Sequence, residues 1–74
     1  MIKATAADEA TLAADLRNIA PLSWSTIERR IAADELKAVV LCLRYLDVDL
    51  ENIARRSGFP LDLLQRIRDR ARLS

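Results

Sequence analysis

The sequence predicts an all-α domain, a small bundle of four to five helices, and three observations support this. First, 51% of the 74 residues are hydrophobic and only 4% are aromatic, a balance that favours helices. Second, one glycine and two prolines leave little room for long loops. Third, apolar side chains recur at three- and four-residue spacings, as on one face of a helix. A chain of this length is expected to be a single domain over residues 1–74 with modest stability.

The first helix is predicted over residues 5–20. Thr5 can cap its free N–H groups, and Asp8 stands where a capping box places an acidic side chain. Pro21 disfavours helical geometry at Ala20 and therefore ends the helix. The inward stripe is Leu12, Leu16 and Ile19, widened by Ala13 and Ala20, and the outward side chains are Asp8, Glu9, Asp15 and Arg17.

A second helix is predicted to start at Ser25, with Glu28 completing a capping box. It either stops near Ala33 or runs on to Leu46, and a break or kink at Asp34 is favoured. Its inward residues are Ile27, Ile31 and Ala32, and its outward ones are Glu28, Arg29 and Arg30. Trp24 precedes it in the connection Leu22-Ser23-Trp24. There the indole anchors the loop over the core with its N–H exposed, or it makes a dimer contact.

The central helix is predicted over residues 34–46, after a break at which Asp34 serves as a new N-cap. Its surface is apolar almost all round, so it should be packed from several sides and form the hub of the core. Cys42 is expected to be a small buried hydrophobe, and Tyr45 to be half-buried. The inward residues are Leu36, Val39, Val40, Leu43 and Leu46.

Residues 49–67 predict two short helices joined by a tight turn. Asp49 is a good N-cap for the first of them. Gly58 stops that helix, because a left-handed residue costs least without a Cβ. Phe59 is expected to pack into the core after the turn, and Pro60 suits the first position of the next helix. The inward residues are Leu50, Ile53, Ala54 and Ser57 in the first helix, and Leu64, Ile67 and Ala71 in the second.

This spacing of small and apolar residues around Gly58 resembles a helix-turn-helix DNA-binding motif. Residues 35–73 also look like the C-terminal promoter-binding domain, region 4, of bacterial sigma factors. The residues that carry this resemblance are Leu41 to Leu46, Leu50 to Ala54, Gly58 to Pro60 and Arg70 to Leu73. In that family the second helix of the motif lies in the DNA major groove. The resemblance implies a tri-helical unit over residues 34–73. We expect residues 1–33 to brace this unit or to form a dimer interface.

The basic residues are concentrated in the predicted motif. Residues 55–74 hold six arginines and two aspartates, a net charge of +4, whereas the whole chain carries only +1. Such an asymmetry suits a phosphate backbone. We expect Arg55 and Arg56 to contact phosphates, and Gln65 and Arg66 to read base edges. The remaining expected DNA-facing residues are Leu61, Asp62 and Asp69 on the exposed face, and Arg68, Arg70 and Arg72 along the backbone.

Several kinds of chemistry are not encoded. The chain has no histidine and one cysteine, Cys42, which excludes a disulfide framework and the usual zinc sites. Gly58 is the only glycine, so there is no phosphate-binding loop. We therefore expect a non-enzyme without cofactor or metal. The longest apolar run, 38–43, is too short to span a bilayer, and no signal peptide is visible, which together predict a cytoplasmic protein without a membrane partner.

These features lead to two functional hypotheses. The first is a small sequence-specific DNA-binding transcriptional regulator of bacterial or phage type, which binds double-stranded DNA as a homodimer. The second is a protein-interaction adaptor or inhibitor that uses a helix-turn-helix-like fold to bind a host protein complex. RNA polymerase or another protein is the partner expected in that case.

Overall fold

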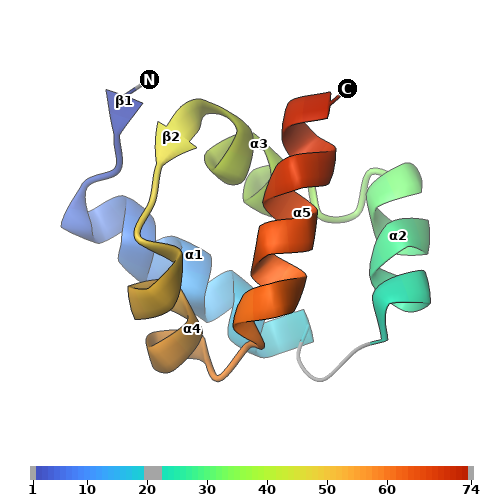
Figure 1. Cartoon of the computed structure of the whole chain (residues 1–74), viewed down its shortest axis with the longest axis horizontal. Helices are drawn as coiled ribbons and strands as arrows, with labels where there is room; N and C mark the ends of the chain where they lie inside the picture. The colour runs from blue at the N-terminus through green and yellow to red at the C-terminus, as the bar shows by residue number, and fades with distance from the viewer. Residues whose placement is uncertain (1, 20–22, 74) are drawn as a thin grey trace.

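The computed structural model describes residues 2–19 and 23–73. In chain order the elements are β1 (Ile2–Lys3), α1 (Ala6–Ile19), α2 (Trp24–Ala32), α3 (Lys37–Tyr45), β2 (Leu46–Asp47), α4 (Leu50–Ser57) and α5 (Leu61–Leu73) (Figure 1). The predicted small all-α bundle is confirmed, with five helices in these two ranges. The predicted end of the first helix at Ala20 and Pro21, and Leu22 in the connection, lie outside the described residues.

Helices α1 and α5 both pack against α3 and α4, and together these four helices enclose most of the core. Figure 1 shows α5 running through the middle of the molecule, with α2 beside it at the edge. Helix α2 has one buried side chain, Ile27. The core side chains are Leu12, Leu16, Ile19, Ile27, Leu36, Val39, Leu43, Leu50, Ile53, Phe59, Leu64 and Ile67. Among the described residues, the inward stripes predicted for α1, α4 and α5 are therefore confirmed, apart from Ala54, which is half-buried.

Two predicted helix caps form as expected. The Asp8 N–H donates to Thr5 Oγ1 at 3.1 Å, and the Thr5 N–H donates to Asp8 Oδ2 at 3.0 Å, which makes a reciprocal capping box at the start of α1. At the start of α4, the Asn52 N–H donates to Asp49 Oδ1 at 3.2 Å. Each bond satisfies an N–H group that the helix itself leaves without an acceptor.

The start of α2 differs from the prediction by two residues. Its N-cap is Ser23, whose Oγ accepts from the Thr26 N–H at 3.3 Å, so Ser25 already lies within the helix. Glu28 therefore makes no capping box. Ala32 was predicted to face inward but is exposed, because the helix ends there and turns its last residue to solvent.

Asp34 ends a helix rather than beginning one, which corrects its assignment as an N-cap. Its φ is +61°, in the left-handed region. The Asp34 N–H donates to the Ile31 carbonyl at 3.0 Å, and the Glu35 N–H donates to the Arg30 carbonyl at 2.9 Å. This pair of bonds is the Schellman arrangement that closes a helix C-terminus. Helix α3 consequently starts at Lys37, three residues later than predicted.

Helix α3 is less enclosed than predicted. Val39 and Leu43 are buried against α1 and α5, as expected of a central helix. However, Leu41 is 41% exposed and Tyr45 is 57% exposed, and Ala38 is also exposed. Val40 is the α3 residue that lines the groove between α2 and α5, so Leu41 and Tyr45 lie on other sides of the helix. Val40, Cys42 and Leu46 were expected in the core and are half-buried.

A short parallel strand pair was not predicted. Residue Ile2 pairs with Leu46, and Lys3 pairs with Asp47. The Ala4 N–H extends the pairing with a bond to the Asp47 carbonyl at 3.0 Å. These bonds fix the residues before α1 beside the connection that enters α4.

The α4–α5 turn takes the predicted form. Gly58 has φ +72°, and its N–H donates to the Ala54 carbonyl at 2.9 Å. Phe59 follows in the core, where its N–H donates to Ser57 Oγ at 3.1 Å. Pro60 stands one residue before α5 rather than at its first position, and its carbonyl accepts the first helical bond, from Leu64.

The two left-handed residues give opposite predictions for stability. Gly58→Val should lower the free energy of unfolding by more than about 1 kcal/mol, because an L-residue at positive φ carries a backbone cost of that order. A Cβ at this position would meet nothing within 4 Å, so the loss would come from the backbone alone. Asp34→Gly relieves the same cost and should raise stability by up to about 1 kcal/mol. Thermal melting measures both, and a Gly58→Val protein that melts at the wild-type temperature would contradict the assignment.

Two leucines on α3 test its packing. Leu43 is 1% exposed, so Leu43→Ala should cost about 2–5 kcal/mol, a large part of the stability of a small domain. Leu41→Ala, on the open side of the same helix, should cost under about 1 kcal/mol. Urea unfolding compares the two variants. Equal losses would show that the sides of α3 have been assigned wrongly.

Candidate nucleic-acid interface

The first basic pair lies on α4. Arg55 and Arg56 occupy the last turn of this helix, and both are exposed. Their charge is favourable at a helix C-terminus, where the carbonyl groups carry partial negative charge. Both side chains are exposed beside the Gly58 turn, and their expected contact with phosphates stays a prediction.

The outer face of α5 carries a mixed set of side chains. Asp62, Gln65, Arg66 and Asp69 are exposed on this helix. Leu61 was expected on the same face, but it is half-buried and packs against the core. Apart from Leu73 at its last residue, which is exposed, the outer face of α5 is polar, with acidic and basic groups on neighbouring turns.

Three of the expected DNA-facing arginines interact within the molecule. Arg68 Nε lies 3.8 Å from Asp69 Oδ1, and Arg70 Nη1 lies 3.7 Å from Glu28 Oε2. Arg72 Nε donates to the Leu43 carbonyl at 3.3 Å, which links α5 to α3. Arg68 Nε is also buried and has no hydrogen-bond partner among the described residues.

Arg66 is placed by a contact that the sequence did not predict. Its guanidinium carbon lies 5.7 Å from the centre of the Trp24 ring, within the range of a cation–π interaction. The two contacts between α2 and α5 advance by four residues on both helices, from Trp24 with Arg66 to Glu28 with Arg70. The helices therefore run side by side in the same direction, which Figure 1 also shows. Trp24 is the first residue of α2 rather than part of a loop, and its half-buried ring packs against the core, whereas the dimer contact considered above stays a prediction.

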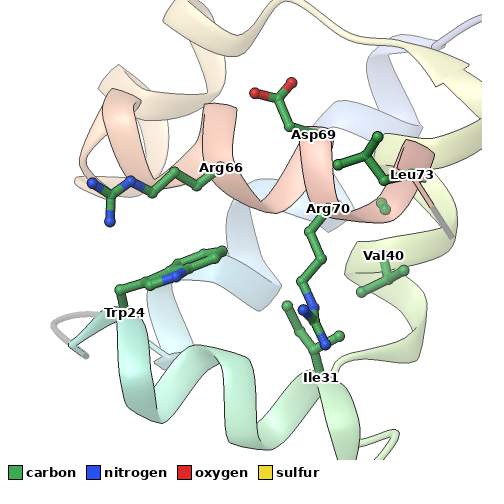
Figure 2. Close-up of a pocket in the computed structure, with 8 residues that line it drawn as sticks. Trp24, Ile31, Val40, Arg66, Asp69, Arg70 and Leu73 are labelled. Carbon is green, nitrogen blue, oxygen red and sulfur yellow. The ribbon is translucent and has the colours of Figure 1, made fainter.

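A groove of about 660 Å³ opens between these two helices. It is lined by Trp24, Ile31, Val40, Arg66, Asp69, Arg70, Ala71 and Leu73 (Figure 2). Sequence reasoning missed this groove, because nothing in the sequence states which neighbour α2 packs against. The sequence signal that could have suggested it is the matched four-residue spacing of Trp24 and Glu28 with Arg66 and Arg70.

Helix α1 positions the motif through Glu9. The Asp49 N–H donates to Glu9 Oε2 at 3.3 Å, and Asn52 Nδ2 lies 3.5 Å from Glu9 Oε1. Glu9 was predicted to face solvent, but its side chain instead satisfies groups at the N-terminus of α4, where negative charge is stabilising. Helix α1 therefore braces the N-terminus of α4, while the role expected for residues 1–33 as a whole stays a prediction.

Cys42 lies half-buried on α3, near acidic side chains of α1. Partial burial raises the pKa of the Cys42 thiol above its ordinary value, and Asp8, Glu9 and Asp15 raise it further. The thiol is therefore protonated at neutral pH and is a poor nucleophile. The described residues contain no group of three potential metal ligands. None of the described helices combines the length and apolar composition that crossing a membrane requires.

Comparison with protein-family models, with curated proteins and with solved structures found no match for the chain.

The internal contacts of Arg72 predict that it contributes to stability, whereas Arg55 does not. Arg72→Ala removes the bond to the Leu43 carbonyl and should cost about 1 kcal/mol, or roughly 4–8 °C in melting temperature. Arg55→Ala, at a solvent-facing site, should change stability by under about 0.5 kcal/mol at physiological salt. Melting curves of both proteins make the comparison. Identical melting temperatures would mean that the α5–α3 bond adds nothing.

Proposed function

We propose that this protein is a small sequence-specific DNA-binding regulator that places α5 in the major groove. The observation that carries the proposal is the helix-turn-helix unit itself. Its left-handed Gly58 turn joins two helices whose exposed sides carry Arg55, Arg56, Gln65 and Arg66. An α-helix fits the major groove of B-form DNA, where base edges can be distinguished. Such a regulator would act in the cytoplasm of a bacterium or in a phage-infected cell.

The two helices would contribute different contacts. Arg55 and Arg56 lie on α4 beside the turn, where a groove-bound α5 would bring them near phosphates. Contacts of this type position a protein but carry little sequence information. Of the other arginines, Arg70 and Arg72 are engaged within the molecule and would add mainly to the general positive field.

Base recognition would fall to Gln65 and Arg66. Both are exposed on α5, and they can bind adenine and guanine in bidentate fashion. The indole of Trp24 restricts Arg66, so less entropy would be lost when its guanidinium binds a base. Asp62 and Asp69 on the same face would disfavour non-specific binding, although an aspartate can accept from a cytosine amine.

The size of the molecule suits a dimer. Helix-turn-helix proteins bind two half-sites about 34 Å apart. The protein measures 29 × 25 × 18 Å, so two copies fit side by side on adjacent half-sites without overlapping. Dimer binding would compensate for the few contacts that one copy can make.

A second candidate is a protein-interaction adaptor or inhibitor that binds a host complex. The acidic pair Asp62 and Asp69 favours it, because both carboxylates are exposed on the face that DNA would approach. They lower the affinity for any polyanion and could instead pair with basic residues of a protein.

Salt dependence distinguishes the two candidates. For a DNA-binding protein, the logarithm of affinity for random duplex DNA should fall steeply with the logarithm of salt concentration, by about 0.9 per phosphate neutralised. Arg55→Ala should weaken all duplexes alike and reduce this slope by about one. Arg66→Ala should cost roughly 1–3 kcal/mol, and only on the preferred sequence. That sequence is obtained by in vitro selection from randomised DNA, and affinities are measured by fluorescence anisotropy.

The control is Lys3→Ala, which removes an exposed positive charge from β1, outside α4 and α5, and should leave the preferred-sequence affinity almost unchanged. A flat salt dependence together with failure to select any duplex would refute the DNA proposal. Loss of a co-purifying protein in an Asp62→Lys, Asp69→Lys variant would then support the adaptor.

A further inference from the structure

The groove between α2 and α5 has the dimensions and lining of a small-molecule site. Its volume of about 660 Å³ lies within the roughly 300–1,000 Å³ of typical ligand pockets. Its apolar lining comes from three helices and consists of Trp24, Ile31, Val40, Ala71 and Leu73. Apolar walls with a few polar groups at the edge are what such sites present.

The charged groups of the groove are arranged on one wall. Figure 2 shows Arg66 extending over the Trp24 ring and Arg70 reaching down toward Ile31, both from α5, while the Asp69 carboxylate points away from the indole. A ligand beside Arg66 would therefore meet its guanidinium group and apolar surface, with the Asp69 carboxylate directed away.

The ion pairs set the charge that a ligand should carry. Glu28 offsets the charge of Arg70 at 3.7 Å, and Arg68 offsets that of Asp69 at 3.8 Å. Within the described part of the chain, the ion pairs do not include Arg66, which contacts the Trp24 ring instead. The groove thus carries one uncompensated cation, which matches a single negative charge.

We propose that this groove binds a small monocarboxylic acid with an apolar body. The body would lie against Trp24, Ile31 and Val40, and the carboxylate would accept hydrogen bonds from Arg66. A guanidinium can stack on an aromatic face and bind a carboxylate bidentately at the same time, which an ammonium cannot do. This proposal goes beyond DNA binding and does not depend on it, because the groove is complete in the free protein.

Trp24 is the only tryptophan of the chain, so its fluorescence reports binding directly. The probes are octanoate, octanol and octylamine, which share an apolar chain and differ in charge. Octanoate should change Trp24 emission saturably and bind about 10-fold or more tightly than octanol, and octylamine should bind more weakly still. Amide NMR shifts should locate the binding between α2 and α5.

Two variants test the assigned groups. Arg66→Gln keeps most of the side-chain size and removes the charge, so octanoate affinity should fall to that of octanol while octanol binding stays the same. Ile31→Glu should weaken both ligands. Arg55→Gln, which removes an arginine outside the groove, should change neither. Thermal melting confirms that each variant is folded.

The proposal is overturned if octanoate binds no better than octanol, or if Arg66→Gln leaves the preference for octanoate intact. Two further outcomes would assign the groove to other occupants and also refute the proposal. One is tight, Arg66-dependent binding of an acidic leucine-containing peptide without binding of octanoate. The other is a dimer in analytical ultracentrifugation that Ile31→Glu dissociates.

Discussion

The chain reverses direction between α4 and α5 within three residues, and that reversal depends on the left-handed backbone of Gly58. The Ser57 hydroxyl supports the turn from inside. Its Oγ donates to the Ile53 carbonyl at 2.7 Å and accepts from the Phe59 N–H. This arrangement satisfies polar groups at a buried helix end and places the Phe59 ring in the core. The relative position of the two exposed arginine-bearing helices follows from it.

Local signals in the sequence were sufficient for much of this architecture. Caps at Thr5 and Asp49, and the apolar stripes of α1, α4 and α5, depend on residues within one or two turns of each other, so spacing alone predicts them. Asp34 is a position at which local sequence patterns are not sufficient. Aspartate suits both an N-cap and a left-handed C-terminal position, and the choice depends on hydrogen bonds to Arg30 and Ile31 that only the folded chain reveals.

The candidate site was predictable in part for the same reason. Helical periodicity identified Gln65 and Arg66 as exposed, because Leu64 and Ile67 beside them had to be inside. It could not predict that Trp24 and Glu28 would meet α5, since those contacts join segments far apart in the sequence. The strand pair of β1 with β2 escaped prediction because two residues carry no recognisable alternation. The candidate site therefore combines the exposed face of α5, which the local sequence determines, with a groove that tertiary packing determines.

The bracing of α4 by α1 also has a consequence for biosynthesis. Glu9 is translated long before Asp49, and the stripe of α1 has its packing partners in α3 and α4. As the nascent chain emerges N-terminus first, α1 has nothing to pack against and must expose its apolar side chains. Helix α5, which supplies Leu64 and Ile67, is translated after all the other helices. The core can therefore form only after α5 has left the ribosome. Until then the apolar side chains of the earlier helices remain exposed, and the chain is most open to chaperone binding and to aggregation.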